Sequence, residues 1–199
     1  SGGIIYQIFP DRFANSRTPK KNVPEDRFLC DDWSKQPEYR QNNGICSLCN
    51  DYYGGDFKGI EQRLDYLKEL GVSCIYLNPI FEAHSNHRYN TADYMKIDPL
   101  LGTEKDFENL IKSAKKKGIS IILDGVFSHT GDDSVYFNRY RRYGDGGAYN
   151  NFDSPYHSWY KFNRFPDSYC AWWGVPSLPE TIEEDSSFNE FINGENGVI

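Results

Sequence analysis

Three short apolar segments alternate with two amphipathic ones, and this order restricts the chain to a small set of folds. Residues 4–9, 72–81 and 119–127 are runs rich in β-forming side chains. Between them, residues 54–71 and 103–118 carry apolar side chains every three or four positions, which is typical of helices packed on one face. The order strand, helix, strand, helix, strand predicts parallel βαβ units, as in a doubly wound sheet or a barrel.

The helix boundaries are marked by their own residues. Thr103 and Asp106 have the spacing of a capping box, and Gly118 is placed to stop that helix. The first helical segment is expected to run as one helix up to Gly71. The third apolar segment is almost uninterrupted, as parallel strands covered on both faces tend to be.

The segments around this core differ in composition. Residues 14–53 are polar and contain many Pro, Asn and Asp residues, so we expect a long loop. From residue 125 onward, aromatic residues and glycines dominate without a regular period. We therefore expect a first domain over residues 1–124, an inserted subdomain over 125–185, and a return towards the first domain over 186–199.

Charge and hydropathy exclude several classes of partner. The net charge of −7 gives no basic patch for nucleic acid or an anionic membrane, and a neutral ligand fits better. No apolar stretch approaches the roughly 20 residues that cross a bilayer. The sequence shows no signal peptide, which favours the cytoplasm as the location.

The five cysteines do not form the pattern of a disulfide framework, because their number is odd. Cys46 and Cys49 form a C-x-x-C pair with Cys30 upstream, but a zinc site would need a fourth ligand that the sequence does not supply. We expect these three to be free thiols in a loop and Cys74 to pack within a strand.

Polar side chains follow each predicted strand where it ends. Asp11 and Arg12 follow the first strand, the segment HSNHRYNTADY at residues 84–94 follows the second, and Asp124 ends the third with His129 close behind. Parallel α/β folds carry their sites at this end of the strands. These residues are therefore site candidates; the alternative is that Asp124 and His129 cap loops or pair with each other.

Four motifs give the chain a family resemblance. The segments YQIFPDRF, GGDFKGI, YLNPIFEAHSNHRYNTADY and LDGVFSH resemble the first third of the α-amylase family, glycoside hydrolase family 13, in its neopullulanase, cyclomaltodextrinase and pullulanase-like branch. They occur in family order over most of residues 3–130, and WWGVPSLPE resembles a later family motif. The resemblance implies an α/β fold, a partial (β/α)₈ TIM barrel of about three β/α units with a loop-rich subdomain inserted after the third strand.

The resemblance also implies roles for individual residues. Tyr89 would be the aromatic platform under the sugar ring, and His129 would hydrogen-bond one of that ring's hydroxyls. Asp124 would support the site from the strand end, and Trp172 or Trp173 would line further sugar subsites. Aromatic faces suit the apolar face of a pyranose, and hydrogen bonds that tighten in the transition state lower the barrier. The implied activity is that of a retaining hydrolase of starch-derived or pullulan-type α-glucan oligosaccharides.

The catalytic carboxylates of the family are not found in this sequence. The family uses an aspartate in a G-x-R-x-D context after the fourth strand and a glutamate after the fifth, and neither is present. We expect both to lie beyond the end of the chain and the chain alone to be inactive. A complete barrel needs roughly 250 residues, so the remainder of the barrel would be needed for a complete fold.

Calcium is a cofactor that many relatives bind after the first strand. Asn15 and Asp56 are the candidate ligands here. Arg17, Lys20 and Lys21 place positive charge where carboxylates would be needed, and calcium requires six to eight oxygens. The sequence therefore argues against a tight calcium site.

Three other functions compete with an α-glucan hydrolase. A non-catalytic α-amylase-like partner protein would need a membrane-spanning helix, which this sequence lacks. A glucan-binding module built on the aromatic segment would bind amylose without cleaving it. A nucleotide-binding doubly wound fold would need a G-x-G-x-x-G motif or a P-loop after a strand, and neither occurs.

Overall fold

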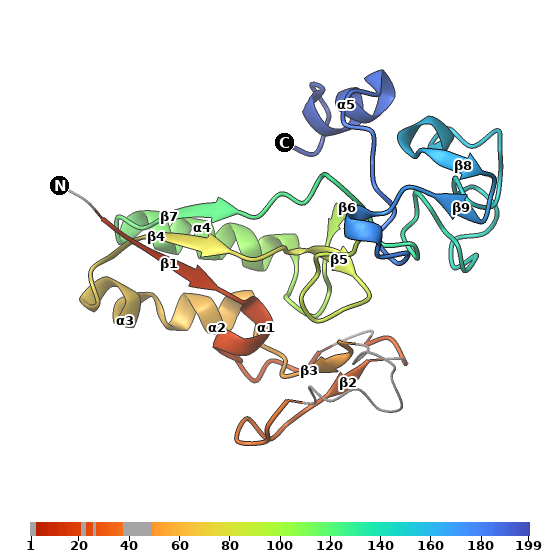
Figure 1. Cartoon of the computed structure of the whole chain (residues 1–199). Coiled ribbons are helices and arrows are strands. Elements are labelled where there is room, and N and C mark those ends of the chain that lie inside the picture. Colours follow the sequence, from red (N-terminus) through yellow and green to blue (C-terminus); the bar gives the residue numbers. More distant parts are fainter. Residues whose placement is uncertain (1–2, 21–22, 26, 38–48) are drawn as a thin grey trace. The chain divides into compact units, whose positions relative to one another are not determined.

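The chain forms two compact units in the computed structural model (Figure 1). The structure describes all residues except 1–2, 21–22, 26 and 38–48, so Lys21 and Cys46 lie outside the described part. We call the first unit the sheet unit; it comprises residues 1–80, 85–87 and 97–124. We call the second the aromatic unit; it comprises residues 81–84, 88–96 and 125–199.

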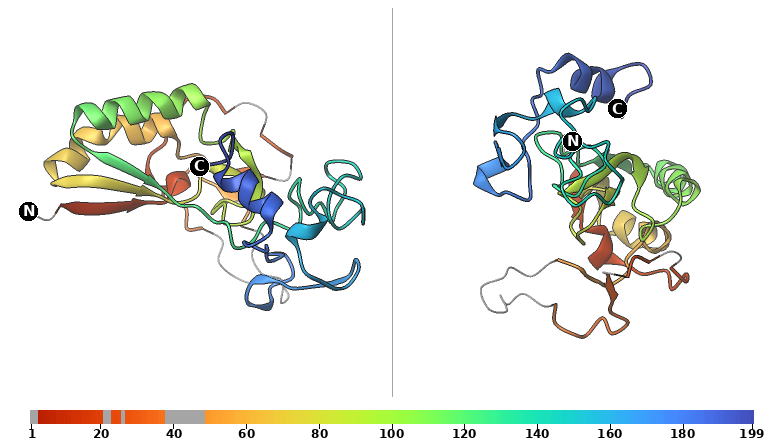
Figure 2. Two further views of the ribbon diagram at one scale, coloured as in Figure 1. Left: turned by 90° about the horizontal axis from the view of Figure 1, so that it is seen from above. Right: turned by 90° about the vertical axis from the view of Figure 1, so that its right-hand side faces the viewer.

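The sheet unit is built on three parallel strands in the order β1-β4-β7. Tyr6 pairs with Ile75, and Ile75 pairs with Ile121. The helices α2, α3 and α4 lie on one side of these strands (Figures 1 and 2). The main elements of the unit are β1 (Ile4–Ile8), α1 (Pro10–Phe13), α2 (Phe57–Gln62), α3 (Leu64–Glu69), β4 (Val72–Leu77), α4 (Glu104–Lys116) and β7 (Ser120–Leu123). The predicted strand–helix alternation and parallel pairing are confirmed.

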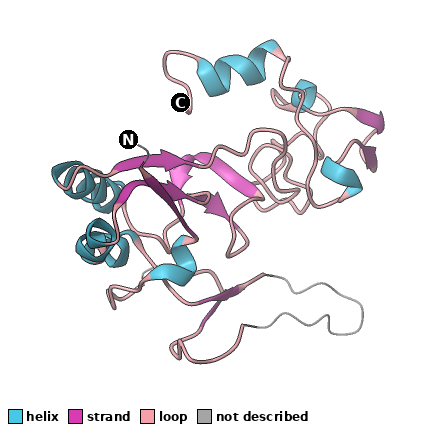
Figure 3. Cartoon of the chain, turned by 60° about the vertical axis from the view of Figure 1, so that its left-hand side comes forward, coloured by secondary structure: helices cyan, strands magenta, loops and turns pink. Residues whose placement is uncertain are grey.

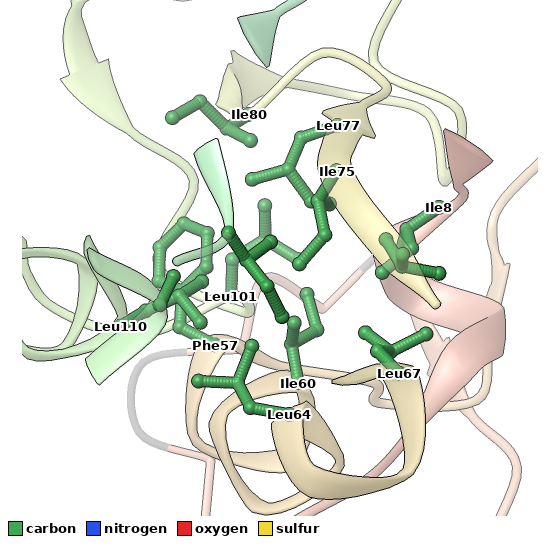
Figure 4. Packing of buried hydrophobic residues seen from close by; sticks show 13 residues of the cluster. Ile8, Phe57, Ile60, Leu64, Leu67, Ile75, Leu77, Ile80, Leu101 and Leu110 are labelled. Carbon is green, nitrogen blue, oxygen red and sulfur yellow. The ribbon is translucent and has the colours of Figure 1, made fainter. Parts of the chain in front are cut away.

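The core of the sheet unit fills the space between the strands and their helices (Figure 4). Side chains from α2, α3 and α4 meet side chains from β1 and β4, and all are essentially excluded from solvent. The labelled members are Ile8, Phe57, Ile60, Leu64, Leu67, Ile75, Leu77, Ile80, Leu101 and Leu110. Each such side chain contributes roughly 1.5–3 kcal/mol when it is fully buried.

Helix α4 has the predicted capping box. The Thr103 hydroxyl accepts the Asp106 backbone N–H at 3.2 Å, and the Asp106 carboxylate accepts the Thr103 N–H at 3.0 Å. The continuous helix predicted over residues 54–71 is wrong, because Arg63 interrupts it with a φ of −99° and a ψ of 3°. The predicted apolar face is nevertheless correct, because α2 and α3 both bury their apolar side chains against the same side of the sheet.

The outer strands are less buried than their composition predicted. In β1, Ile4 and Ile5 are 48% and 63% exposed, although the sequence predicted a buried strand. In β7, Ile122 and Leu123 are 44% and 41% exposed. The prediction that this strand is covered on both faces is therefore wrong. Helices α2–α4 cover one side of the sheet, and the apolar side chains on the other side of these strands remain open to solvent.

The long loop predicted over residues 14–53 contains a small parallel pair, β2 (Phe28–Leu29) with β3 (Asp51–Tyr52). The C-terminal end of this loop is bound to the end of β1 through Asp11, whose carboxylate is fully buried. The Asp11 oxygens accept the backbone N–H groups of Tyr53 at 3.0 Å and Gly54 at 3.1 Å, and they pair with Arg12 at 2.9 Å. This carboxylate holds two distant segments together.

The aromatic unit has little regular structure, and rings form its core. Its elements are β5 (Phe81–Ala83), β6 (Thr91–Ile97, whose last residue belongs to the sheet unit), two one-turn 3₁₀ helices (His157–Trp159 and Trp172–Gly174), β8 (Phe162–Arg164), β9 (Ser168–Tyr169) and α5 (Ser186–Asn193). The pairing of β5 with β6 was not predicted from the sequence. Most of the chain from residue 125 to 185 is loop (Figure 3), as the irregular composition indicated.

The core of this unit places Tyr94 against Tyr136 at a ring-centroid distance of 5.6 Å, and Tyr136 against Trp159 at 5.3 Å. Such aromatic pairs add roughly 0.5–1.5 kcal/mol beyond the area they bury.

Among the described residues, no helix is both long and apolar enough to span a bilayer.

Replacing Asp11 tests its role as an anchor. Asp11→Ala should lower the free energy of unfolding by about 3–5 kcal/mol, because it leaves two buried backbone N–H groups without their acceptor and removes one of the two ion pairs of Arg12. Urea denaturation followed by circular dichroism measures the change. Asp31→Ala, at an exposed position, is the matched control and should change stability by less than about 0.5 kcal/mol. Equal stability of the two variants would contradict the anchoring role.

Candidate functional site

His129 is the best-defined candidate, and it is only 4% exposed. Its Nε2 lies 3.1 Å from the carbonyl oxygen of Tyr89, and its Nδ1 lies 3.1 Å from Oγ of Ser128. A carbonyl can only accept, so Nε2 carries the ring proton and, in the neutral ring, Nδ1 accepts from the Ser128 hydroxyl. Burial lowers the pKa of His129, against the opposing effects of the Tyr89 carbonyl and the Glu180 charge.

Three aromatic rings form a continuous stack that begins at this histidine. His129 packs on Trp172 with ring centroids 5.0 Å apart. Trp172 stacks on Trp173 with ring centroids 4.8 Å apart and an angle of 7° between the ring planes. Trp173 is 87% exposed and has a φ of 50°. A bulky residue in this left-handed region costs about 1–3 kcal/mol, and such strain tends to occur at functional positions.

A neighbouring segment holds the His129 backbone in place. The N–H of Thr130 donates to the carbonyl of Pro179 at 3.1 Å, and the N–H of Thr181 donates to the carbonyl of Ser128 at 3.0 Å. Glu180 therefore lies opposite His129 in an antiparallel bridge. Glu180 was not predicted as a site residue from the sequence, where its place in the motif WWGVPSLPE was the only available signal.

Tyr94 supports the same backbone from the core of the aromatic unit. Its hydroxyl lies 2.5 Å from the carbonyl oxygen of Val126 and 3.1 Å from that of His129. Burial raises the pKa of Tyr94 far above its usual range, so the phenol stays protonated and acts as a donor. Tyr94 is thus a structural member of the motif NTADY.

Asp124 belongs to the sheet unit and stands at the carboxyl end of β7. Its N–H donates to the carbonyl of Leu77 at 3.0 Å, which extends the ladder between β4 and β7 by one residue. Burial and a hydrogen bond to Asp124 raise the pKa of Tyr76 on the adjacent strand. The structure brings Tyr89, His129 and Trp172 together within the aromatic unit, while Asp124 is held by Tyr76 within the sheet unit.

Two further histidines of the motif HSNHRYNTADY have local partners. His84 places Nε2 3.2 Å from the hydroxyl of Tyr143, and His87 places Nδ1 3.2 Å from Oγ of Ser85. Both lie in the loop between β5 and β6. Neither is part of the ring stack at His129.

The calcium candidates have their oxygens engaged by protein donors. Asp56 Oδ2 accepts from Oγ of Ser16 at 2.7 Å and from Nζ of Lys20 at 2.5 Å. Asp56 Oδ1 accepts the Gly59 N–H at 2.7 Å as the N-cap of α2, and Asn15 Oδ1 accepts the N–H of the residue two positions on. A lysine ammonium therefore neutralises the carboxylate that calcium would need, and these residues do not fit a calcium site.

No disulfide joins any two of the described cysteines. Cys30, Cys49, Cys74 and Cys170 are all half-buried. Cys46, the other half of the C-x-x-C pair, lies outside the described residues. Within the part of the chain that the structure describes, no cluster of three or more His, Cys, Asp or Glu side chains could hold a metal ion.

The structure is that of an α/β protein, in which parallel strand–helix alternation is followed by a unit where a buried histidine packs on a tryptophan ring. The family model for the α-amylase catalytic domain matches residues 7–188. The chain therefore belongs to the α-amylase family, in the neopullulanase-like branch of glycoside hydrolase family 13.

Relatives of known name support this assignment. The chain is 53% identical over 156 residues to an amylopullulanase of Thermoanaerobacterium saccharolyticum, a match that covers 71% of this chain and 12% of the relative. It is 36% identical over 189 residues to neopullulanase 2 of Thermoactinomyces vulgaris, covering 95% of this chain and 30% of the relative. The chain thus spans a minor part of the length of the relatives it matches.

Solved structures agree with the family. The type III pullulan hydrolase of Thermococcus kodakarensis superimposes with a TM-score of 0.77 at 34% identity, over 95% of this chain and 34% of its own. The cyclic α-maltosyl-(1→6)-maltose hydrolase of Arthrobacter globiformis, solved with that sugar, gives a TM-score of 0.77 at 32% identity, over 94% of this chain and 39% of its own.

The lowered pKa of His129 predicts a pH dependence. The folded state binds the proton less tightly than the unfolded state, whose histidine titrates near 6.5. The stabilising contribution is therefore complete above pH 6.5 and is lost as the pH falls below it. Urea unfolding followed by tryptophan fluorescence at pH 7.5 and 5.5 should show a larger fall in stability for the wild type than for His129→Asn. Identical falls would refute the assignment.

The Lys20–Asp56 pair predicts independence from calcium. Calcium chloride at 5 mM should leave the unfolding midpoint of the wild type unchanged, since the ammonium already neutralises the carboxylate. Lys20→Ala should lose on the order of 3 kcal/mol, because both side chains are almost fully buried. Lys58→Ala, which removes a half-exposed partner of Asp106, is the control and should lose less than about 1 kcal/mol. Stabilisation of the wild type by calcium would overturn this interpretation.

Proposed function

We propose that the chain is the first part of the catalytic domain of a retaining α-glucan hydrolase that acts on starch-derived or pullulan-type oligosaccharides. Membership of the α-amylase family supports the chemistry. The names of the relatives support the substrate class, since they include an amylopullulanase, a neopullulanase and a pullulan hydrolase. The proposal concerns the whole protein, of which this chain matches only a part.

Within that proposal, β1, β4 and β7 are the first three strands of a (β/α)₈ barrel. Their parallel order and the helices between them support this assignment. Residues 125–185 form a loop-rich insertion after the third strand, and residues 186–199 lead back towards the barrel. The remaining barrel units would cover the apolar side chains that are exposed on β1 and β7.

The stack of His129, Trp172 and Trp173 is the observation that carries the proposed binding site. Trp173 offers an exposed indole face, and the apolar face of a glucose ring stacks well on such a surface. Tyr89 serves as the platform for the ring next to the scissile bond. Asp124, at the carboxyl end of β7, is assigned a supporting role in sugar binding on the family resemblance.

His129 contributes hydrogen bonding rather than proton transfer. Its Nε2 proton is engaged by the Tyr89 carbonyl, which fixes the tautomer and leaves Nδ1 as an acceptor. A sugar hydroxyl would replace the Ser128 hydroxyl at Nδ1, and a hydrogen bond that tightens in the transition state lowers the barrier. Because burial lowers its pKa, the ring is neutral at pH 7 and can accept.

Bond cleavage in retaining enzymes requires two carboxyl groups about 5–5.5 Å apart, one as nucleophile and one as general acid. The chain contains no G-x-R-x-D motif that would supply the nucleophile. The residues of this chain therefore bind and orient the sugar. Their contribution to rate is positional, because they hold the glycosidic bond in the geometry that the carboxylates need.

A non-catalytic α-amylase-like partner and a stand-alone glucan-binding module are the alternatives. Neither is favoured, because the named relatives are hydrolases. A reducing-end assay tests whether the chain alone can cleave a glucan. The chain alone should release no new reducing ends from maltoheptaose or pullulan, and release would show that the carboxylate pair lies within these 199 residues after all.

Replacing the exposed indole tests the binding site. Trp173→Ala should weaken binding of maltoheptaose to the chain about two- to tenfold, which corresponds to the roughly 0.5–1.5 kcal/mol of an aromatic stacking contact. Isothermal titration calorimetry measures the affinity. Phe152→Ala removes another exposed ring of the aromatic unit, outside the stack, and should bind as the wild type does. An equal loss in both variants would argue for unspecific contact with the sugar.

A further inference from the structure

The sheet unit contains a cavity that the proposed glucan site does not use. Its volume is about 540 Å³, within the usual range for pockets that hold small organic ligands. Residues from three separate segments line it: the turn after α1, the loop before β3, and the junction between α2 and α3. The lining side chains that matter here are Phe13, Asn15, Arg17, Trp33, Gln62 and Arg63.

Among the described residues that line the cavity, two carry a positive charge and none carries a carboxylate. Neither Arg17 nor Arg63 forms an ion pair with any described residue, although the chain as a whole has a net charge of −7. Other arginines of the unit are neutralised: Arg12 pairs with Asp11, and Arg27 pairs with Asp98. A local excess of guanidinium groups in an acidic protein favours an anionic ligand.

The backbone holds Arg17 in an unusual conformation. Its φ is 64°, in the left-handed region that a side-chain-bearing residue rarely adopts. The N–H of Arg17 donates to Oδ1 of Asn15 at 2.8 Å, and Ser16 is tied to Asp56 through both its N–H and its hydroxyl. Side-chain hydrogen bonds therefore hold this turn in place, and Arg17 is among the residues that line the cavity.

The opposite wall depends on the break between α2 and α3. Arg63 ends one helix and begins the next, so Gln62 and Arg63 occupy a corner that a continuous helix would lack. Trp33 packs edge-to-face on Tyr53 with centroids 6.1 Å apart. Its indole N–H is buried and has no acceptor among the described residues, so a ligand oxygen that reached it would complete its hydrogen bonding.

These groups match one class of ligand. Guanidinium groups bind phosphate through paired hydrogen bonds, and aromatic walls suit a sugar ring. We propose that this cavity binds a sugar phosphomonoester, with Arg17 and Arg63 holding the phosphoryl group and Phe13 and Trp33 lining the ring. The proposal is independent of the glucan site, since all of its residues belong to the sheet unit and none to the ring stack at His129.

Calorimetric titration of the 199-residue chain with glucose 6-phosphate, glucose and inorganic phosphate tests the proposal. Glucose 6-phosphate should bind at least tenfold more tightly than either of the other two. The double variant Arg17→Gln/Arg63→Gln should weaken that binding at least tenfold. Arg164→Gln removes an exposed arginine of the aromatic unit and should leave it within twofold of the wild type. Circular dichroism and urea unfolding confirm that each variant is folded.

Several results would overturn the proposal. No binding of glucose 6-phosphate to the folded chain would do so, as would equal affinity in the folded double variant. Equally tight binding of glucose would indicate a neutral sugar site, and equally tight binding of phosphate would indicate a simple anion site. A maltotetraose carrying a 6-phosphate distinguishes the sources: a tenfold preference for it assigns the phosphate to a glucan chain, and equal affinity assigns it to a free sugar phosphate.

Discussion

The packing of three helices against one side of three parallel strands is the interaction on which the rest of the molecule depends. Side chains such as Phe57, Leu64, Ile75 and Leu110 exclude water from the space between the layers. This burial drives the strands into parallel order, because each helix must return the chain to the same end of the sheet. The ends of β1, β4 and β7 then lie at a common edge, from which the long loops depart.

Polar residues at that edge act mainly as anchors in the sheet unit. Asp11 and Asp56 each gather donors from two segments that are distant in sequence, and both are almost fully buried. A buried carboxylate is stable only when its oxygens are satisfied, so each one fixes the geometry of the loop that satisfies it. In the aromatic unit, hydroxyl groups and ring contacts take this role, as Tyr94 does for the backbone of His129.

Sequence reasoning succeeded where the local signal and the tertiary structure agree. The capping box at Thr103 and Asp106 is a contact between neighbours in the chain, so its formation needs no distant partner. The prediction of burial failed where the exposure of a strand depends on whether one or both of its faces are covered. Ile5 and Leu123 lie in strands with the composition of buried ones, yet they are 63% and 41% exposed, because hydrophobicity records only that a side chain can be buried.

Some contacts of the site involve residues that lie in recognisable sequence motifs, but the motif alone does not reveal the contact. The motif around WWGVPSLPE indicated a family resemblance, but the bridge between Glu180 and His129 joins residues about fifty positions apart. The pocket at Arg17 and Arg63 gave no signal at all, because it depends on a helix break at a residue with good helical propensity.

The sequence by itself determined the order of strands and helices, the helix caps, the aromatic character of the second unit and the family to which the chain belongs. These properties follow from the period of apolar residues and from short motifs, both of which are local. The tertiary structure alone decided which carboxylates became anchors, which tautomer His129 adopts, and that Lys20 neutralises Asp56. Such outcomes depend on desolvation and on donors brought from distant segments, and neither quantity is encoded in the neighbours of a residue.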